Sequence, residues 1–425
     1  MVSHMGQQTT LINPSIRKAR KGDLSQRSLR LKFDVPLFLI TMTLVVFGAV
    51  MVYSASYDVA FYVNRLKPPS FMFQRQATFL GLGLLGMGVM AVIDYRKWSK
   101  LAVIGMFATI LALIVVLLMG RGSSEFSRNL SNGSGQPSEL AKLMTVIYLA
   151  VWLYAKREDL SDVHLGLIPL AAILGIVGGL IFIQPDLSAA MTVILLGGIM
   201  FFLAGGDIRQ IFFLIVFTIV IGLITVRVHP HGLERLESFR AGLKDPLALA
   251  DQVQMALAAF VNGGWFGVGI GEGTMKLSIL PAAHTDSIFA VIGEEVGLVG
   301  ASLVVIMFGL FLWRGLVIAR RAPDGLGSLL AAGIAVWITM EAFMNMMALT
   351  GLMPFAGNPL PFFSIGGSNL VSTLLGVGIM LNISRLSEQK KLEEERRTFS
   401  ALISLRGRDW RRRISRPGRT RSTRR

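Results

Sequence analysis

The chain has 425 residues, of which 53% are hydrophobic and only 16% are charged, and its mean hydropathy is +0.60. Soluble globular domains carry about 25% charged residues, so this composition excludes an ordinary soluble protein and indicates one that crosses a membrane several times. The sequence contains no cysteine, which excludes disulfides, cysteine metal ligands and a cysteine nucleophile.

Ten apolar stretches match the length needed to cross a hydrocarbon layer of about 30 Å. We therefore expect an all-α polytopic membrane protein with ten transmembrane helices, and an even number of crossings places both termini on one side. In chain order the stretches are Val35–Ser56, Ala77–Ile93, Leu101–Met119, Leu140–Tyr154, Leu165–Ile183, Leu187–Ala204, Ile211–Val226, Ile288–Ile318, Leu326–Leu349 and Leu370–Ile383.

The basic residues indicate which side is cytoplasmic. Most of the 42 Lys and Arg residues lie in the two tails and in alternate loops, and such residues collect on the cytoplasmic side. We expect a basic cytoplasmic N-tail at 1–33, whose first residues resemble a cloning remnant, a membrane domain at 34–385 and a basic cytoplasmic C-tail at 386–425. The polar extracytoplasmic loops, where a site is expected, are Tyr57–Gln76, Gly120–Ser138, Arg227–Ser287 and Met353–Ser368.

The fourth stretch opens with the segment Gln136–Lys142, in which Pro137 and Ser138 are helix start signals. Glu139 and Lys142 are three residues apart, so they share a helix face and can form an ion pair. Two interpretations stay open. The pair only neutralises two charges that would be costly in lipid, or Lys142 faces a phosphate-bearing substrate while Glu139 holds it in place.

A second polar segment, Gln184–Leu187, joins the fifth and sixth stretches on the same side of the membrane. Asp186 directly precedes an apolar run, which is the usual place of an N-cap residue. An N-cap role and a role in a polar site at this side of the membrane are both compatible with the pattern.

The loop Arg227–Ser287 is about sixty residues long, which is too long for a simple connection and predicts structure of its own. Asp251–Phe260 has the pattern of an amphipathic helix lying at the interface. The glycine-rich segment Gly263–Gly273 superficially resembles a nucleotide-binding loop. No βαβ pattern surrounds it, so we expect these glycines to permit a tight turn or a close approach of two backbones.

The loop ends with His284, Thr285 and Asp286, directly before the eighth stretch. An ionisable group at the mouth of an apolar helix is costly, and a carboxylate there can accept a proton from a substrate. Asp286 is therefore the candidate general base. Glu294 is eight residues further along the predicted helix, about 12 Å at 1.5 Å per residue, which argues against a two-carboxylate glycosidase. The five histidines show no metal-binding spacing.

The segment Thr350–Asn369 contains too many prolines and glycines for a continuous helix. Backbone of this kind at membrane depth must be buried in protein or line a water-filled cavity. Its end, Gly366-Gly367-Ser368, presents amide groups that suit an anion at a helix start. A plain re-entrant linker is the alternative.

The C-tail is rich in Lys and Arg. Its composition is typical of a solvated, disordered tail, and attraction to anionic lipid is the alternative. Nucleic-acid binding is not expected, because no recognition module accompanies the charge.

Together these motifs resemble the SEDS family (shape, elongation, division and sporulation) over residues 34–385. The resemblance rests on four segments in one order: Gln136–Lys142, Gln184–Leu187, His284–Glu295 and Pro359–Ser368. Gly271–Gly273, Lys276 and the run up to His284 are more similar to the division branch (FtsW) than to the elongation branch (RodA). Asn369 stands where a second serine is common in the family.

The resemblance implies a peptidoglycan glycosyltransferase that polymerises lipid II into β-1,4 glycan strands by inversion, at the outer face of the cytoplasmic membrane. Asp286 matches the family's essential aspartate. The substrate-binding residues implied by the matching motifs and loop are Gln136, Ser138, Glu139, Lys142, Asp186, Gln254, His284, Thr285, Ser364, Gly366, Gly367 and Ser368.

The resemblance also implies partners and a location. We expect a class B penicillin-binding protein and other membrane proteins of the division machinery as partners, and a place in the bacterial cytoplasmic membrane at the septum. A divalent cation, Mg or Mn, is expected to assist, its ligands being unassigned, and no organic cofactor is expected.

The competing hypothesis is a flippase or another transporter of lipid-linked precursors, since charges inside the membrane and broken helices serve transport equally well. Glu341, within the ninth stretch, supports this alternative. A third hypothesis is a structural division scaffold, which would tolerate loss of Asp286.

Overall fold

The computed structural model describes residues 33–63, 70–120, 136–184, 186–228, 230–278, 280–355 and 357–414. Within these ranges the protein is helical and has no β-strand. The N-tail up to residue 32 and the loop 121–135 lie outside the described residues, so the predictions made for them are not tested by the fold.

The predicted apolar stretches all fall on helices. Among the described residues, eight helices are long and apolar enough to cross a membrane, and α7 is a shorter apolar helix. Helix α8 covers the seventh stretch. The helices are α2 (Val35–Val63), α3 (Ser70–Val92), α4 (Tyr95–Gly120), α5 (Pro137–Ala155), α6 (Ile168–Ile183), α7 (Leu187–Leu203), α8 (Ile208–Val228), α9 (Pro230–Gly242), α10 (Asp251–Gly263), α11 (Met275–Ser278), α12 (Ile288–Glu295), α13 (Gly297–Arg321), α14 (Gly325–Leu349) and α15 (Gly367–Ile414), with short helical turns at Val163–Leu167 and Pro246–Ala248.

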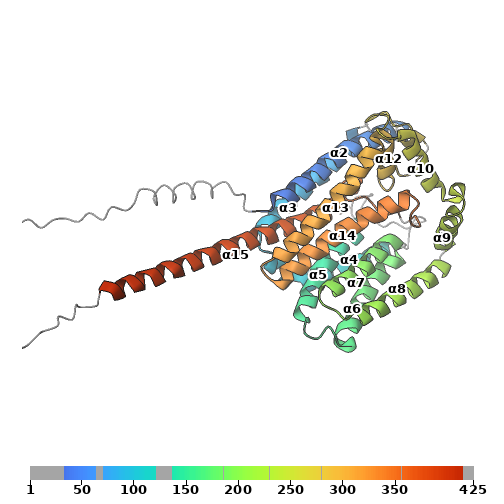
Figure 1. The fold of residues 1–425 in the computed structure, drawn as a ribbon. Coiled ribbons are helices and arrows are strands. Elements are labelled where there is room, and N and C mark those ends of the chain that lie inside the picture. Colours follow the sequence, from blue (N-terminus) through green and yellow to red (C-terminus); the bar gives the residue numbers. More distant parts are fainter. Residues whose placement is uncertain are drawn as a thin grey trace, which may run out of the picture.

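Helix α14 lies at the centre of the bundle, packed against α5, α7, α13 and α15 (Figure 1). Its small residues permit this close packing, as is usual between helices in membranes. A Cβ atom on Gly333 would lie 2.9 Å from a Val146 methyl carbon and 3.0 Å from the Met200 sulfur. The bulky Trp337 is fully buried on the same helix. Most residues of α14 are therefore buried within the bundle.

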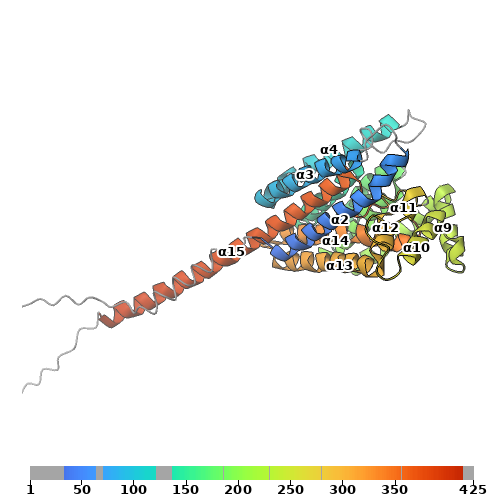
Figure 2. The ribbon, with the colours of Figure 1, turned by 90° about the horizontal axis from the view of Figure 1, so that it is seen from above.

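Helix α15 is longer than the sequence predicted. The apolar stretch ends at Ile383, but the helix continues to Ile414 and stands well clear of the bundle (Figures 1 and 2). The interpretation of 384–414 as disordered was therefore wrong. The physical reason is local: this part is rich in Glu, Lys, Arg, Gln and Leu, which favour helix, and the first proline after Ile383 is Pro417.

The eighth apolar stretch is not one helix. Helix α12 ends at Glu295 and α13 begins at Gly297, whose φ of +75° breaks the chain direction. The helix α10 and the turn after it are confirmed. A Cβ on Gly263 would collide with the Gly293 carbonyl oxygen, so the turn needs glycine for close approach to α12. Because the turn occupies this space, the stretch cannot run straight.

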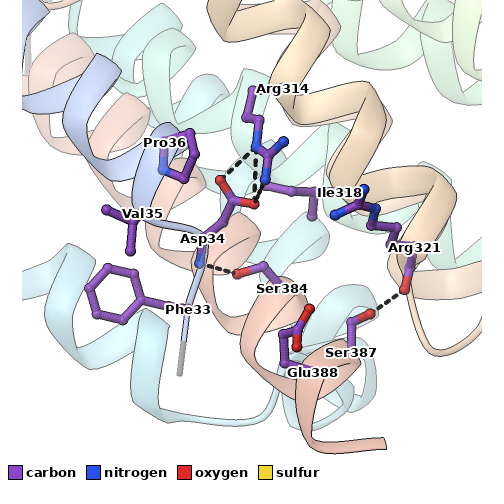
Figure 3. Close-up of a pocket in the computed structure, with 10 residues that line it drawn as sticks. All are labelled: Phe33, Asp34, Val35, Pro36, Arg314, Ile318, Arg321, Ser384, Ser387 and Glu388. Carbon is purple, nitrogen blue, oxygen red and sulfur yellow. Dashed lines mark hydrogen bonds and ion pairs between the residues drawn. The ribbon is translucent and has the colours of Figure 1, made fainter. Parts of the chain in front are cut away.

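The opposite end of the bundle is held by a half-buried ion pair (Figure 3). Arg314 of α13 donates through Nε to Asp34 Oδ1 at 2.8 Å and through Nη2 to Asp34 Oδ2 at 2.6 Å. The backbone N–H of Asp34 donates to Ser384 Oγ at 3.0 Å. These contacts join the entry of α2, the end of α13 and the point where α15 leaves the bundle, around a cavity of about 590 Å³.

Asp324 caps the N-terminus of α14 at this end. Its Oδ1 accepts from the Gly327 backbone N–H at 2.8 Å and from the Tyr95 hydroxyl at 2.8 Å. Its Oδ2 accepts from Arg96 Nη2 at 2.9 Å. Burial alone would raise the pKa of this carboxyl, but the three donors outweigh burial and hold the pKa below its ordinary value.

We expect the ionised Asp324 carboxylate to stabilise the fold in a pH-dependent way. A lowered folded-state pKa gives stability that is present above the unfolded pKa of about 3.9 and is lost as the pH falls through the folded-state value. Asp324→Asn should therefore melt below the wild type at pH 7, and the gap should close below about pH 4. Thermal unfolding in detergent between pH 7 and pH 3 measures this gap.

The control is Asp159→Asn, which removes an exposed partner of Lys156 and should change the melting temperature little at any pH. A gap for Asp324→Asn that persists unchanged at pH 3 would show that the charge is not the source of the stability.

Candidate functional site

Segments that are far apart in the sequence meet around one cavity of about 230 Å³. The start of α5, the start of α7, the turn before α12, the irregular segment before α15 and the first turn of α15 all contribute. The lining residues are Gln136, Glu139, Lys142, Asp186, Ser188, Ala189, Thr285, Asp286, Gly357, Asn358, Pro359, Ser364, Ile365, Gly366, Ser368 and Asn369.

Lys142 is only 1% exposed and lies between two carboxylates. Its Nζ is 2.8 Å from Glu139 Oε2, as the spacing predicted, and it also pairs with Glu341 of α14. Asn369 of α15 donates to Glu139 Oε2 at 2.7 Å. One buried cation thus holds two carboxylates on two helices, and a third helix contacts the cluster through an amide.

The cluster contains more acidic than basic groups. Glu341 Oε2 has no hydrogen-bond partner among the described residues, while its other oxygen is paired with Lys142. Lys142 is therefore not an unpaired cation waiting for an anion. Any anionic group that enters the cavity meets a lysine whose charge is already balanced.

Asp186 is an N-cap residue and also lines the cavity. Its Oδ1 accepts from the Ala189 backbone N–H at 3.2 Å, which satisfies an amide at the start of α7. Its Oδ2 accepts from Gln136 Nε2 at 2.9 Å and from Ser138 Oγ at 3.3 Å. The two polar segments that the sequence singled out are thus joined directly through this carboxylate.

The turn that carries Asp286 is fixed through its backbone. The carbonyl of Asp286 accepts from Asn345 Nδ2 at 2.7 Å, and the carbonyl of Thr285 accepts from Ser364 Oγ at 2.9 Å. The carbonyl of His284 accepts from the Ile365 N–H at 3.0 Å. These contacts leave the Asp286 side chain on the cavity wall.

Asp286 does not lie on a helix. Helix α12 begins at Ile288, so the expectation that Asp286 and Glu294 share one helix was wrong. A Cβ on Gly357 would lie 3.3 Å from Asp286 Oδ2, and Gly357 has a φ of +52°. A glycine therefore gives the carboxylate room at this wall.

Four predicted site residues do not line the cavity. Ser138 lies behind it on Asp186. Gln254 donates to the carbonyls of Leu247 and Leu249 at 2.8 and 2.7 Å, within the long loop. Gly367 packs against the ring of Phe79.

His284 is the fourth of these residues. It contributes its backbone carbonyl to the fixed turn, while burial lowers the pKa of its imidazole. Its Nδ1 has no hydrogen-bond partner among the described residues. The contact that the structure shows for His284 therefore supports the turn rather than the cavity wall.

The sequence reasoning missed Asn345, which is buried in α14. Its Nδ2 donates to the carbonyls of both Asp286 and Asn358, at 2.7 and 2.6 Å. An asparagine inside an otherwise apolar helix is a signal, because an amide in lipid needs partners. Its partners could not be found, since both lie in irregular segments.

We expect Lys142→Met to destabilise the fold strongly, because Glu139 and Glu341 would lose their cation. Breaking a buried ion pair typically costs about 3–5 kcal/mol. The double variant Lys142→Met/Glu341→Gln leaves one carboxylate fewer unpaired and should recover more than about 1 kcal/mol. Thermal unfolding in detergent measures both. Lys156→Met, in an exposed pair, is the control and should cost less than about 1 kcal/mol.

The single variant Glu341→Gln is measured alongside them. If the loss of stability in the double variant equalled the sum of the losses in Lys142→Met and Glu341→Gln, this would contradict a coupled cluster.

Comparison with known proteins agrees with the motifs. Residues 35–389 match the FtsW/RodA/SpoVE family, described as cell cycle proteins. The probable peptidoglycan glycosyltransferase FtsW of Geobacter sp. (strain M18) is 36% identical over 357 residues, which cover 83% of this chain and 96% of that protein. Stage V sporulation protein E of Bacillus subtilis (strain 168) is 37% identical over 361 residues, covering 83% of this chain and 97% of that one.

Solved structures show the same fold. A chain of a peptidoglycan synthase complex that coordinates polymerization and crosslinking superposes with a TM-score of 0.68 at 27% identity, covering 84% of this chain and 99% of that chain. The rod shape determining protein RodA of Thermus thermophilus gives a TM-score of 0.57 at 26% identity, covering 84% and 98%. The chain therefore belongs to the FtsW/RodA/SpoVE family, which is the SEDS family that its motifs resemble.

Proposed function

We propose that this protein is a lipid II polymerase of the division machinery, with Asp286 as its general base. The carrying observation is that Asp286, Asp186, Glu139 and Lys142 line a single cavity although three separate segments supply them. Relatives named probable peptidoglycan glycosyltransferase FtsW support the reaction class. Ten crossings, cytoplasmic termini and a septal location belong to the same proposal.

The proposed step joins two lipid II molecules. Asp286 accepts the proton of the sugar 4-hydroxyl of one molecule, and the oxygen attacks the anomeric carbon of the other. The bond from that carbon to the undecaprenyl pyrophosphate breaks, and the pyrophosphate leaves with the electron pair. Attack from the opposite face converts an α-linked donor into a β-1,4 glycan. A carboxylate held by its backbone is suited to this, because its position does not depend on a mobile chain.

The leaving pyrophosphate needs stabilisation that Lys142 alone does not supply. Glu139, Asp186 and Asp286 line the same cavity as Lys142, so its acidic side chains outnumber its basic ones. The N-terminus of α15, beginning at Gly367, adds a positive dipole end and amides without helical acceptors. Lys142 offsets part of the charge of these acidic side chains, which lowers the repulsion that an entering anion meets.

A divalent cation remains part of the proposal. The described residues contain no cluster of three or more His, Asp or Glu side chains that could hold a metal ion. The protein therefore does not offer a preformed site in this part of the chain, and we assign no step to a metal. A Mg or Mn ion would enter as the counter-ion of the pyrophosphate oxygens.

The transport alternative loses its main support. Glu341 suggested transport because it is a carboxylate inside a membrane helix, but it is ion-paired with Lys142 beside the cavity. The solved peptidoglycan synthase complex combines polymerization with crosslinking, which supports a class B penicillin-binding protein as partner. Other division proteins as partners rest on the family resemblance alone.

Polymerisation of lipid II by the purified protein tests the proposal. In detergent, with a class B penicillin-binding protein present, the wild type should form glycan polymer, and Asp286→Asn should lower the rate by about 100-fold or more. Asp251→Asn is the matched control, because Asp251 lies on α10 and outside the cavity lining, and should keep the wild-type rate.

Equal rates of polymer formation by the wild type and Asp286→Asn would show that Asp286 is not the general base. Absence of polymer with every partner and cation tried would contradict the proposed polymerase activity. Detergent contains no closed compartment, so a flippase would produce no signal in this assay.

A further inference from the structure

The end of α10 and the turn after it present large apolar side chains to the outside. Phe266 is 83% exposed, Val261 81% and Trp265 69%. Ile270 in the same turn is also exposed, as are Leu298 and Val299 in the first turn of α13. We call these six residues the apolar tip. A group of exposed apolar side chains this large marks an interaction surface rather than a water-facing loop.

The apolar tip carries no charge. The sequence has no Asp, Glu, Lys or Arg between Asp251 and Glu272, and none between Glu295 and Arg314. Glu294 and Glu295 are buried beneath the tip, and the exposed Glu272, two residues after Ile270, lies at its edge. Moving the six side chains of the tip into an apolar environment therefore carries no free-energy cost for desolvating a charge.

Several backbone groups of the turn are paired within the protein. Irregular backbone enters lipid only when its N–H and C=O groups are paired internally. The pairs are Gly267 N to Gly263 O at 2.8 Å, Val268 N to Glu294 O at 3.0 Å, Gly269 N to Glu295 O at 3.0 Å, Leu298 N to Gly264 O at 2.9 Å and Val299 N to Trp265 O at 3.1 Å. These five amides thus meet the condition that lipid imposes.

The tip continues an exposed apolar stripe of α13. Val299, Leu303, Ile306, Leu310 and Trp313 are spaced three or four residues apart, share one helix face and are exposed. Val299 and Trp313 are fourteen residue steps apart, which is about 21 Å at 1.5 Å per residue. A hydrocarbon layer is about 30 Å thick, so the stripe is too short by itself. The tip extends this apolar surface beyond the N-terminal end of α13.

We propose that the apolar tip is a membrane anchor, inserted into the leaflet at the end of the bundle opposite the exit of α15 (Figure 1). Trp265 and Phe266 lie at the headgroup level, where aromatic side chains collect. A lipid surface fits better than a protein partner. Protein interfaces form about one hydrogen bond per 100–200 Å², whereas the six side chains of the tip carry a single polar group, the indole N–H of Trp265, and the amides of Gly267, Val268, Gly269, Leu298 and Val299 are already paired.

Nitroxide labelling tests the anchor, and the absence of cysteine from the chain gives single labels without background. Phe266→Cys and Val261→Cys provide two positions in the tip, so failure of one variant to fold leaves a second. Leu303→Cys, on the stripe of α13, is the lipid-facing control. Lys244→Cys, an exposed polar position of the same loop, is the water-facing control.

Each variant is placed as a single copy in nanodiscs of phosphatidylethanolamine and phosphatidylglycerol. Collision with oxygen, which concentrates in lipid, is compared with collision with a water-soluble nickel complex. Labels in the tip should collide readily with oxygen. Their collision rate with the nickel complex should be about 10-fold lower than that of the label at position 244. The label at position 303 should behave like the tip labels. When Trp265→Ser is added to the Phe266→Cys variant, the label at position 266 should collide more often with the nickel complex, because the anchor is weakened.

Two results would overturn the anchor. Tip labels that collide with nickel as freely as the label at 244 would show that the tip faces water and awaits a protein partner. Tip labels shielded from both oxygen and nickel would show that the protein itself covers them. Glycan synthesis plays no part in these measurements, so the anchor and the proposed enzyme stand or fall separately.

Discussion

The need to neutralise a lysine inside the bundle organises the centre of this protein. Lys142 is buried at the start of α5, and its charge is matched by Glu139 on the same helix and by Glu341 on α14. Asn369 brings α15 to the same cluster. Removing a buried partner costs several kcal/mol, so these three helices hold a fixed arrangement. The cavity lies directly beside them and inherits that fixed geometry.

A second buried cation does the same for the long loop. Lys276 of α11 is 2.7 Å from Glu295 Oε1 and 3.0 Å from Ser54 Oγ of α2. Glu294 Oε1 accepts from the Thr274 N–H at 2.9 Å and from Asn262 Nδ2 at 2.8 Å. Two consecutive glutamates at the end of α12 thus fix the loop: Glu294 binds it at Asn262 and Thr274, and Glu295 binds it at Lys276. The break before Gly297 is the backbone consequence, because the turn after α10 occupies the space that a straight helix would need.

Much of this arrangement follows from the sequence. Apolar length locates the helices, because a bilayer needs about twenty apolar residues per crossing. Spacing predicts the pair of Glu139 and Lys142, since three residues are one turn. Asp286 was found because a carboxylate at the mouth of an apolar helix is costly.

Long-range partners were not predictable. The pairing of Lys142 with Glu341 joins residues 199 positions apart, and no local pattern encodes it. The break in the eighth stretch was missed for the same reason, because its cause is a turn that precedes it by some thirty residues and packs against it. The predicted end of α15 at Ile383 was too early, because it was taken from the end of the apolar stretch. Apolarity marks the part of a helix that lies in the membrane, and a helix can continue beyond it. Glu, Lys and Arg favour helix without being apolar.

The position of Asp286 follows from these two fixed regions. The chain from Thr274 to Ser287 is short and is held at its first residue by Glu294. At its other end Asn345 and Ser364 hold the backbone carbonyls of Asp286 and Thr285. A segment tied at both ends by buried groups has little freedom to shift. The carboxylate is therefore placed by the bundle and not by its own rotamer alone, which is the condition that a general base beside a bulky lipid-linked substrate must meet.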